Sequence, residues 1–166
     1  MSFLDADQQA LASEIGTLLT ERGQTVAVAE ATTGGLVSAA LLWVPGASRY
    51  FAGGGVVYTL KSRIALAGVT PEQYANYRGT TPEMLADLAE SMRVRLEATW
   101  AIGESGLAGP GPGRSGAPAG RTTLAVAGPV SRTSVIETGI DDRGENMSRF
   151  LTAALTFLRD AIIEAS

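Results

Sequence analysis

The sequence contains no histidine and no cysteine, so its chemistry must use hydroxyl groups, carboxylates, arginines and its one lysine, Lys61. Without those two residue types a thiolate nucleophile, a sulfur-ligated metal and any mechanism that uses imidazole as a base are excluded. Any chemistry that uses an amine must pass through Lys61 or the N-terminus. The residues of interest are therefore hydroxyls that lie close to a charged partner.

Candidate hydroxyls follow two apolar runs that are typical of buried strands. Thr32 and Thr33 lie on a strand-to-helix turn, where either a catalytic role or capping of the following helix would use them. Ser105 begins a glycine-rich segment, where it can serve a site or make a hydrogen bond at a strand end. Glu30 ends a buried strand, which costs free energy unless the carboxylate is paired. It is therefore either a functional carboxylate or half of an ion pair with an arginine.

Residues 106–120 contain so many glycines and prolines that they must form a loop. The segment is either a surface connection or a binding loop whose backbone amides cradle an anion, with Arg114 and Arg121 adding positive charge. No phosphate-binding loop of the GxxxxGK[ST] type is present. Farther on, Asp141 and Asp142 precede a predicted helix, and we interpret this pair as structural, because acidic residues favour a helix start.

The elements that must position these residues alternate between helix and strand. A length of 166 residues with 45% hydrophobic residues suits one ordered domain. Three glycines in the second strand imply a bulge or a close backbone approach. We predict a single three-layer α/β domain over residues 1–166, with a mixed central sheet flanked by helices. The predicted helices are 5–21, 36–43, 61–67, a short one begun by Pro71, 81–98 and 142–163, and the strands are 25–29, 53–58, 100–105, 122–127 and 133–138.

Charge and hydropathy limit the partners. A net charge of −4 argues against binding of nucleic acid, because that affinity comes from basic residues that neutralise phosphates. The longest apolar run, residues 39–44, is far shorter than the roughly 20 residues of a membrane helix. The first residues also lack the basic start of a signal peptide. The sequence therefore predicts a cytoplasmic protein with no membrane partner.

Five segments in order resemble the CinA C-terminal domain family of competence/damage-inducible proteins. They are AEATTGG at 29–35, VPGAS at 44–48, VYT at 57–59 with LAGV at 66–69, GESGLAGPG at 103–111, and Asp142-Arg143. This family includes deamidases of nicotinamide mononucleotide (NMN), which hydrolyse the nicotinamide carboxamide to the acid and release ammonia. The resemblance implies an α/β fold, no metal or other cofactor, a pyridine nucleotide as ligand, and a hydroxyl nucleophile assisted by a lysine. We also expect a homo-oligomer.

The sequence departs from this family pattern at its reactive positions. The position of the expected nucleophilic serine holds Ala31, and the lysine expected five residues after Tyr58 is Arg63. A methyl group cannot attack a carbonyl, and arginine stays protonated and cannot act as a base. Lys61 can replace the expected lysine only if the backbone there is not a regular helix. Two side chains that are two residues apart on a helix point in directions that differ by about 200°.

The resemblance assigns catalytic and substrate-binding roles to positions at three strand ends, which should converge on one pocket. We expect deamidation of NMN to be impaired or carried by a rearranged hydroxyl. The alternatives are a pyridine-nucleotide-binding protein without catalysis, acting as a sensor or partner subunit, and an assembly module with no ligand. The candidate catalytic residues are Glu30, Thr32, Thr33, Tyr58 and Ser105, and the candidate substrate-binding residues are Ala31, Gly34, Gly35, Lys61, Arg63, Gly106 and Gly109, with no metal ligand.

Overall fold

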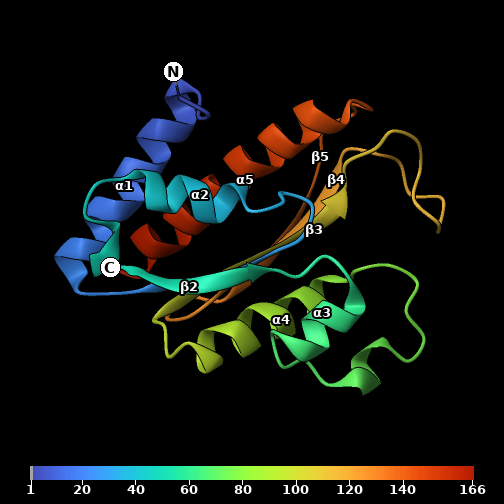
Figure 1. The fold of residues 1–166 in the computed structure, drawn as a ribbon, viewed down its shortest axis with the longest axis horizontal. Helices are drawn as coiled ribbons and strands as arrows, with labels where there is room; N and C mark the ends of the chain where they lie inside the picture. The colour runs from blue at the N-terminus through green and yellow to red at the C-terminus, as the bar shows by residue number, and fades with distance from the viewer. Residues whose placement is uncertain (1) are drawn as a thin grey trace.

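The computed structural model describes residues 2–166 and shows a five-stranded sheet between two helical layers (Figure 1). The strands lie in the order β2-β1-β3-β4-β5. β1 pairs with β2 and β3 in parallel, whereas the β3–β4 and β4–β5 pairs are antiparallel. The predicted three-layer α/β fold with a mixed sheet is therefore confirmed. The strands are β1 (Val26–Glu30), β2 (Phe51–Val56), β3 (Trp100–Leu107), β4 (Arg121–Ala127) and β5 (Arg132–Glu137).

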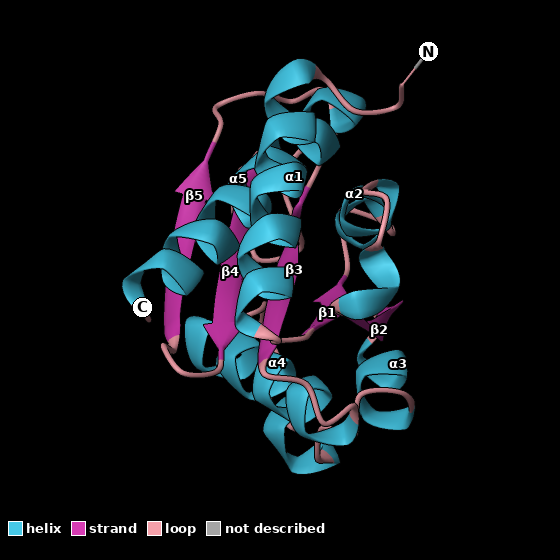
Figure 2. Cartoon of the chain, turned by 90° about the vertical axis from the view of Figure 1, so that its left-hand side faces the viewer, coloured by secondary structure: helices cyan, strands magenta, loops and turns pink. Residues whose placement is uncertain are grey.

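Helices cover both faces of the sheet. In Figure 1, α1, α2 and α5 lie on one face and α3 and α4 on the other, and Figure 2 shows the same two layers from the side. The α-helices are α1 (Ala6–Arg22), α2 (Leu36–Trp43), α3 (Leu60–Ala65), α4 (Pro82–Arg95) and α5 (Arg143–Glu164). Two short 3₁₀ helices, η1 (Ala47–Arg49) and η2 (Pro71–Tyr74), lie in the connections. The segment begun by Pro71 is thus a 3₁₀ turn.

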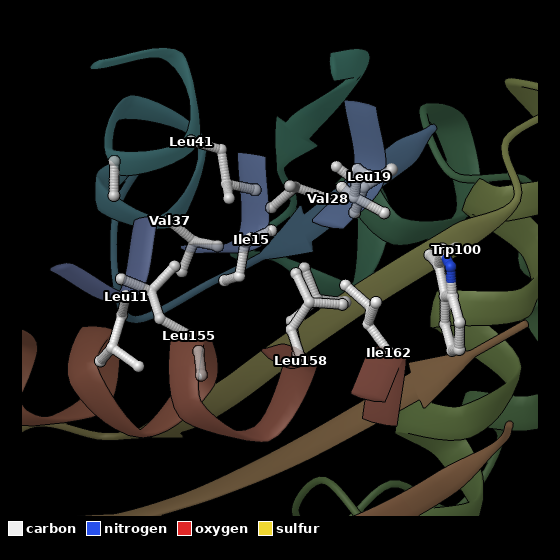
Figure 3. Close-up of a cluster of buried hydrophobic side chains, with 14 of the residues drawn as sticks. Leu11, Ile15, Leu19, Val28, Val37, Leu41, Trp100, Leu155, Leu158 and Ile162 are labelled. Carbon is white, nitrogen blue, oxygen red and sulfur yellow. The ribbon is translucent and has the colours of Figure 1, made fainter. Parts of the chain in front are cut away.

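Alternation along β1 gives the two faces of the sheet different cores. Val26 and Val28 join the large side chains of the three-helix layer, which Figure 3 shows around Ile15, Leu41 and Leu155. Ala27 and Ala29 belong to the other core, beneath α4. Because successive side chains in a strand point to opposite faces, the valine and alanine positions separate cleanly. The small residues allow α4 to pack close to the sheet.

Local signals set the helix ends largely as expected. Thr81 caps α4 by accepting a hydrogen bond from the Met84 amide at 3.2 Å, with Pro82 at the first helical position. α1 ends at Gly23, which adopts the left-handed conformation with φ of 62°. β3 differs from the prediction: it continues to Leu107, because its last residues pair with β4 where the glycine-rich segment was expected to be loop already.

Glycine at position 54 is required by a close approach of two backbones. A Cβ there would lie 2.3 Å from the Val28 carbonyl oxygen on β1. A Cβ on Gly55 would meet only the Val57 side chain, at 3.7 Å. The predicted close approach is confirmed, and the β1–β2 register also shifts between Val26 and Ala27.

We expect Gly54→Ala to lower the free energy of unfolding by about 3 kcal/mol, because the added methyl must push β1 and β2 apart. Gly55→Ala is the matched control and should change it by less than about 1 kcal/mol. Urea denaturation followed by circular dichroism measures both. Equal stabilities of the two variants would show that the contact between β1 and β2 is looser than the structure has it.

Across residues 2–166, none of the helices combines the length and the apolar character that a membrane crossing requires.

Candidate functional site

The carboxyl ends of β1, β2 and β3 meet at one edge of the sheet. Glu30, the last residue of β1, is level with Val56 on one side and Glu104 on the other. Beyond the strands, the Val57 amide donates to the Glu30 carbonyl at 2.8 Å, and the Ala31 amide donates to the Glu104 carbonyl at 2.9 Å. The three segments that resemble family motifs therefore converge, as an open α/β sheet favours.

A cleft of about 170 Å³ opens at this edge. Of the candidate residues, Thr32, Tyr58, Gly106 and Gly109 line it, and the others do not. Its remaining lining comes from the glycine-rich loop and from the first residue of α5, in the set Leu107, Ala108, Pro110, Gly111, Pro112, Gly113 and Arg143.

Glu30 is fully buried and its carboxylate caps helix α2. One oxygen accepts from the Thr33 hydroxyl at 2.7 Å and from the amides of Gly35 and Val37 at 2.9 and 3.1 Å. The other oxygen accepts from the Ser38 amide at 2.9 Å and hydroxyl at 2.8 Å. The ion pair with an arginine that we considered is not formed in residues 2–166. Donors at the start of a helix compensate the burial of this charge instead.

Glu104 is a second fully buried carboxylate, which lies in the GESGLAGPG segment but was not among the candidate residues. Its Oε1 accepts from the Thr33 amide at 2.9 Å, the Thr33 hydroxyl at 3.0 Å and the Ala31 amide at 3.3 Å. Its Oε2 accepts from the hydroxyls of Thr32 and Thr122, the latter at 2.7 Å. Glu104 follows an apolar run, as Glu30 does, so the signal that identified Glu30 could also have identified Glu104.

Neither threonine caps helix α2, which corrects one of the two interpretations given above. The N-cap position is Gly35, which has no side chain to accept a hydrogen bond. The hydroxyls of Thr32 and Thr33 donate to carboxylates instead. Thr33 lies between Glu30 and Glu104 and contacts both, so the turn between β1 and α2 is held by buried acidic side chains.

Arg63 is buried, with 3% of its surface exposed, and lies beside the end of β3. Its Nε donates to the Val57 carbonyl at 3.1 Å, its Nη1 to the Thr80 hydroxyl at 3.2 Å and its Nη2 to the Ser105 hydroxyl at 2.8 Å. The Thr80 hydroxyl also lies 3.1 Å from that of Ser105 and 3.0 Å from that of Tyr77. Within residues 2–166 no carboxylate forms a salt bridge with Arg63. Hydrogen bonds to neutral oxygen atoms therefore stabilise the positive charge of Arg63.

Lys61 and Arg63 belong to the same helix, α3, and differ in burial. Lys61 is exposed, whereas Arg63 is buried, as a spacing of two residues on a regular helix dictates. Lys61 therefore does not replace a lysine at position 63. Arg63 also affects a neighbouring tyrosine. Burial raises the pKa of the Tyr74 hydroxyl, and the positive charge of Arg63 opposes part of that rise.

Hydrogen bonds connect the glycine-rich loop to the start of α5. Arg143 donates from Nη1 to the Gly109 carbonyl at 2.6 Å, and the Gly111 amide donates to Asp141 at 2.8 Å. The Asn146 side chain donates to the Ala108 carbonyl at 2.9 Å. These contacts fix the part of the loop that lines the cleft.

Two glycines of the cleft lining have no room for a side chain. A Cβ on Gly106 would lie 2.5 Å from the Arg121 carbonyl oxygen, and a Cβ on Gly109, which has a φ of +93°, would lie 2.6 Å from the Asp141 carbonyl oxygen. Arg114 and Arg121 are exposed and do not line the cleft.

Asp142 caps α5 by accepting a hydrogen bond from the Glu145 amide at 2.8 Å. A structural role for the Asp141–Asp142 pair is thus what the hydrogen bonds show.

Gly34 is exposed, with a φ of 62°, and Ala31 is buried, with 3% of its surface exposed. Within residues 2–166, no three side chains of the histidine, cysteine, aspartate or glutamate type are grouped so as to hold a metal ion. The chemistry at this edge is that of hydroxyls, two carboxylates, a buried guanidinium and the exposed Arg143.

Comparison with solved structures shows the same fold in other proteins. The competence/damage inducible protein of Agrobacterium tumefaciens superposes with a TM-score of 0.87 at 29% sequence identity, over 97% of this chain and 99% of that one. The competence damage-inducible protein A of Klebsiella pneumoniae superposes with a TM-score of 0.88 at 24% identity, over 94% of this chain and 97% of that one.

Sequence comparison identifies relatives and the family. A CinA-like protein of Synechocystis sp. is 40% identical over 163 residues, which are 96% of this chain and 39% of that protein. A CinA-like protein of Acidobacterium capsulatum is 45% identical over 116 residues, which are 70% of this chain and 28% of that protein. The chain thus spans less than half the length of these relatives. The model of the CinA C-terminal domain matches residues 8–162. The resemblance to the family is confirmed, and the chain belongs to the CinA C-terminal domain family.

Proposed function

We propose that this chain binds a pyridine nucleotide such as NMN in the cleft and that its deamidation of that nucleotide is lost or strongly reduced. The observation that carries the proposal is the pair of residues at positions 31 and 63. Ala31 offers only a buried methyl group, and Arg63 holds a permanent charge among neutral oxygens. A serine and a lysine at these positions would form the nucleophile and base that the family resemblance implies.

In the proposed binding protein, the two buried carboxylates act as supports and neither serves as the missing base. Glu30 and Glu104 each have five contacts with amide or hydroxyl donors at hydrogen-bond distance, and one donor, the Thr33 hydroxyl, is shared between them. A carboxylate with roughly four lone-pair sites has little capacity left for the proton of a nucleophile. The same contacts account for both residues as supports of the turn between β1 and α2.

A rearranged amidohydrolase is the second candidate, and one contact favours it. The Thr32 side chain lines the cleft, and its hydroxyl donates to Glu104. A hydroxyl that donates to a carboxylate is the arrangement of a nucleophile and its base. In this case the unmodified chain would release ammonia from NMN.

Binding is tested by thermal denaturation of the unmodified chain with NMN at increasing concentration. A ligand that binds only the folded state stabilises it by about 2.7 kcal/mol at a hundredfold excess over Kd. We expect the melting temperature to rise with the logarithm of the NMN concentration. If NMN, other pyridine nucleotides and adenine nucleotides all leave the melting temperature unchanged, the proposal fails and an assembly module without a ligand is favoured.

A further inference from the structure

We propose that Arg143 recognises the phosphate of the bound nucleotide, so that the cleft selects phosphomonoesters over the corresponding nucleosides. The inference deepens the proposed function and rests on it. It assigns recognition of the ligand's negative charge to a residue at the start of α5, outside the three strand ends where the substrate-binding residues were expected.

The lining of the cleft is complementary to an anion. Arg143 is its one charged side chain, and the rest of the lining is glycine, proline, alanine and leucine with Thr32 and Tyr58. A single cation with no carboxylate beside it in the wall attracts negative charge into the cleft. Tyr58, which is 56% exposed, provides an aromatic face against which a pyridine ring can stack.

The start of helix α2 is a common place for a phosphate, but here it is already filled. The amides of Gly35, Val37 and Ser38 donate to Glu30, and the Thr33 amide donates to Glu104. An internal carboxylate thus occupies the position that a ligand phosphate would take at a helix N-terminus. A second anion beside these two would be repelled.

The two basic residues of α3 are also unsuited to this role. The three nitrogen atoms of the buried Arg63 guanidinium each donate to an oxygen of the protein, and Arg63 does not line the cleft. Lys61 is exposed on another face of the helix and does not line the cleft either. In the described part of the chain, Arg143 is the basic residue that the cleft presents.

Arg143 combines a fixed position with free donors. Its bond to the Gly109 carbonyl at 2.6 Å uses one of the five N–H groups of the guanidinium. The side chain is exposed, so other N–H groups can form the paired hydrogen bonds that guanidinium makes with phosphate. The neighbouring Asp141 and Asp142 carboxylates do not line the cleft, and each accepts a hydrogen bond from a backbone amide, that of Gly111 and that of Glu145 respectively.

The test is isothermal titration calorimetry with NMN and with nicotinamide riboside, which lacks the phosphate. We expect the unmodified chain to prefer NMN by at least about tenfold, as one charge-assisted pair contributes. Arg143→Ala should abolish this preference and leave riboside affinity within about threefold, while Arg143→Lys should keep part of it. Arg149→Ala, on the same helix and paired with Glu145 at the surface, is the charge-matched control and should keep the full preference.

Asp141→Ala separates charge recognition from loop tethering, because it frees the Gly111 amide but leaves Arg143 in place. We expect it to weaken both ligands equally and preserve the preference for NMN. The inference is overturned if Arg143→Ala keeps the preference, or if it weakens both ligands equally as Asp141→Ala does; the proposed function then still stands. If the unmodified chain binds neither ligand, the proposed function itself fails.

Discussion

Glu30→Gln should lower the free energy of unfolding by about 3 kcal/mol, whereas Glu104→Gln should lower it by less than about 1 kcal/mol. Both oxygens of Glu30 accept from backbone amides, of Gly35 and Val37 on one side and of Ser38 on the other. A glutamine must therefore point its NH₂ group at an amide N–H in either orientation. The variant buries an unsatisfied donor and also loses the negative charge at the start of α2.

The hydrogen-bond partners of Glu104 can accommodate a glutamine, whereas those of Glu30 cannot. Its Oε2 accepts only from the hydroxyls of Thr32 and Thr122, and a hydroxyl can rotate to accept a hydrogen bond instead. A glutamine NH₂ group at that position keeps both partners. Urea denaturation of the two variants measures the difference. Equal losses would show that charge alone, and not the direction of the hydrogen bonds, determines the stability of these buried groups.

Much of the fold could be predicted because strands and helices leave local signals. The run of valine and alanine before Glu30, the threonine and proline at the start of α4 and the glycine after α1 each mark an element within a few residues. The opposite exposure of Lys61 and Arg63 also followed from helical periodicity alone. In each case neighbours in sequence determine the outcome.

The candidate site was harder to predict because its contacts join distant parts of the chain. The partners of Glu104 come from residues 71 to 73 positions earlier and 18 positions later. That Glu30, and not a threonine, caps α2 depends on how the carboxylate folds back over the turn. Arg143 lies 34 residues from Gly109, and only the packing of α5 brings it to the cleft. Single-sequence patterns carry no information about such distances.

The double variant Ala31→Ser, Arg63→Lys should release ammonia from NMN at least about 100-fold faster than the unmodified chain. Positions 31 and 63 lie beside the cleft, although neither side chain lines it. The Ala31 amide contacts the Glu104 carbonyl and Arg63 contacts the Ser105 hydroxyl at 2.8 Å, while Thr32 and Gly106, the next residues after Ala31 and Ser105, line the cleft. A serine and a lysine there restore a nucleophile and a group able to take its proton. General acid–base catalysis alone contributes about 10²-fold or more.

The single variants are the controls for this gain. Ala31→Ser alone lacks the base and Arg63→Lys alone lacks the nucleophile, so each should release ammonia more slowly than the double variant. Groups that act as a unit are non-additive, and the gain should therefore exceed the product of the two single effects. A double variant that binds NMN and folds stably but releases no ammonia would show that positions 31 and 63 are not the reactive pair.

The most direct test of the account is the release of ammonia from NMN by the unmodified chain, measured at an NMN concentration that raises its melting temperature. We expect binding with little or no ammonia release above the rate in protein-free buffer, because the cleft is present while Ala31 and Arg63 offer neither nucleophile nor base. Sustained release over many turnovers per chain would contradict it, and would favour the rearranged hydroxyl nucleophile at Thr32 instead.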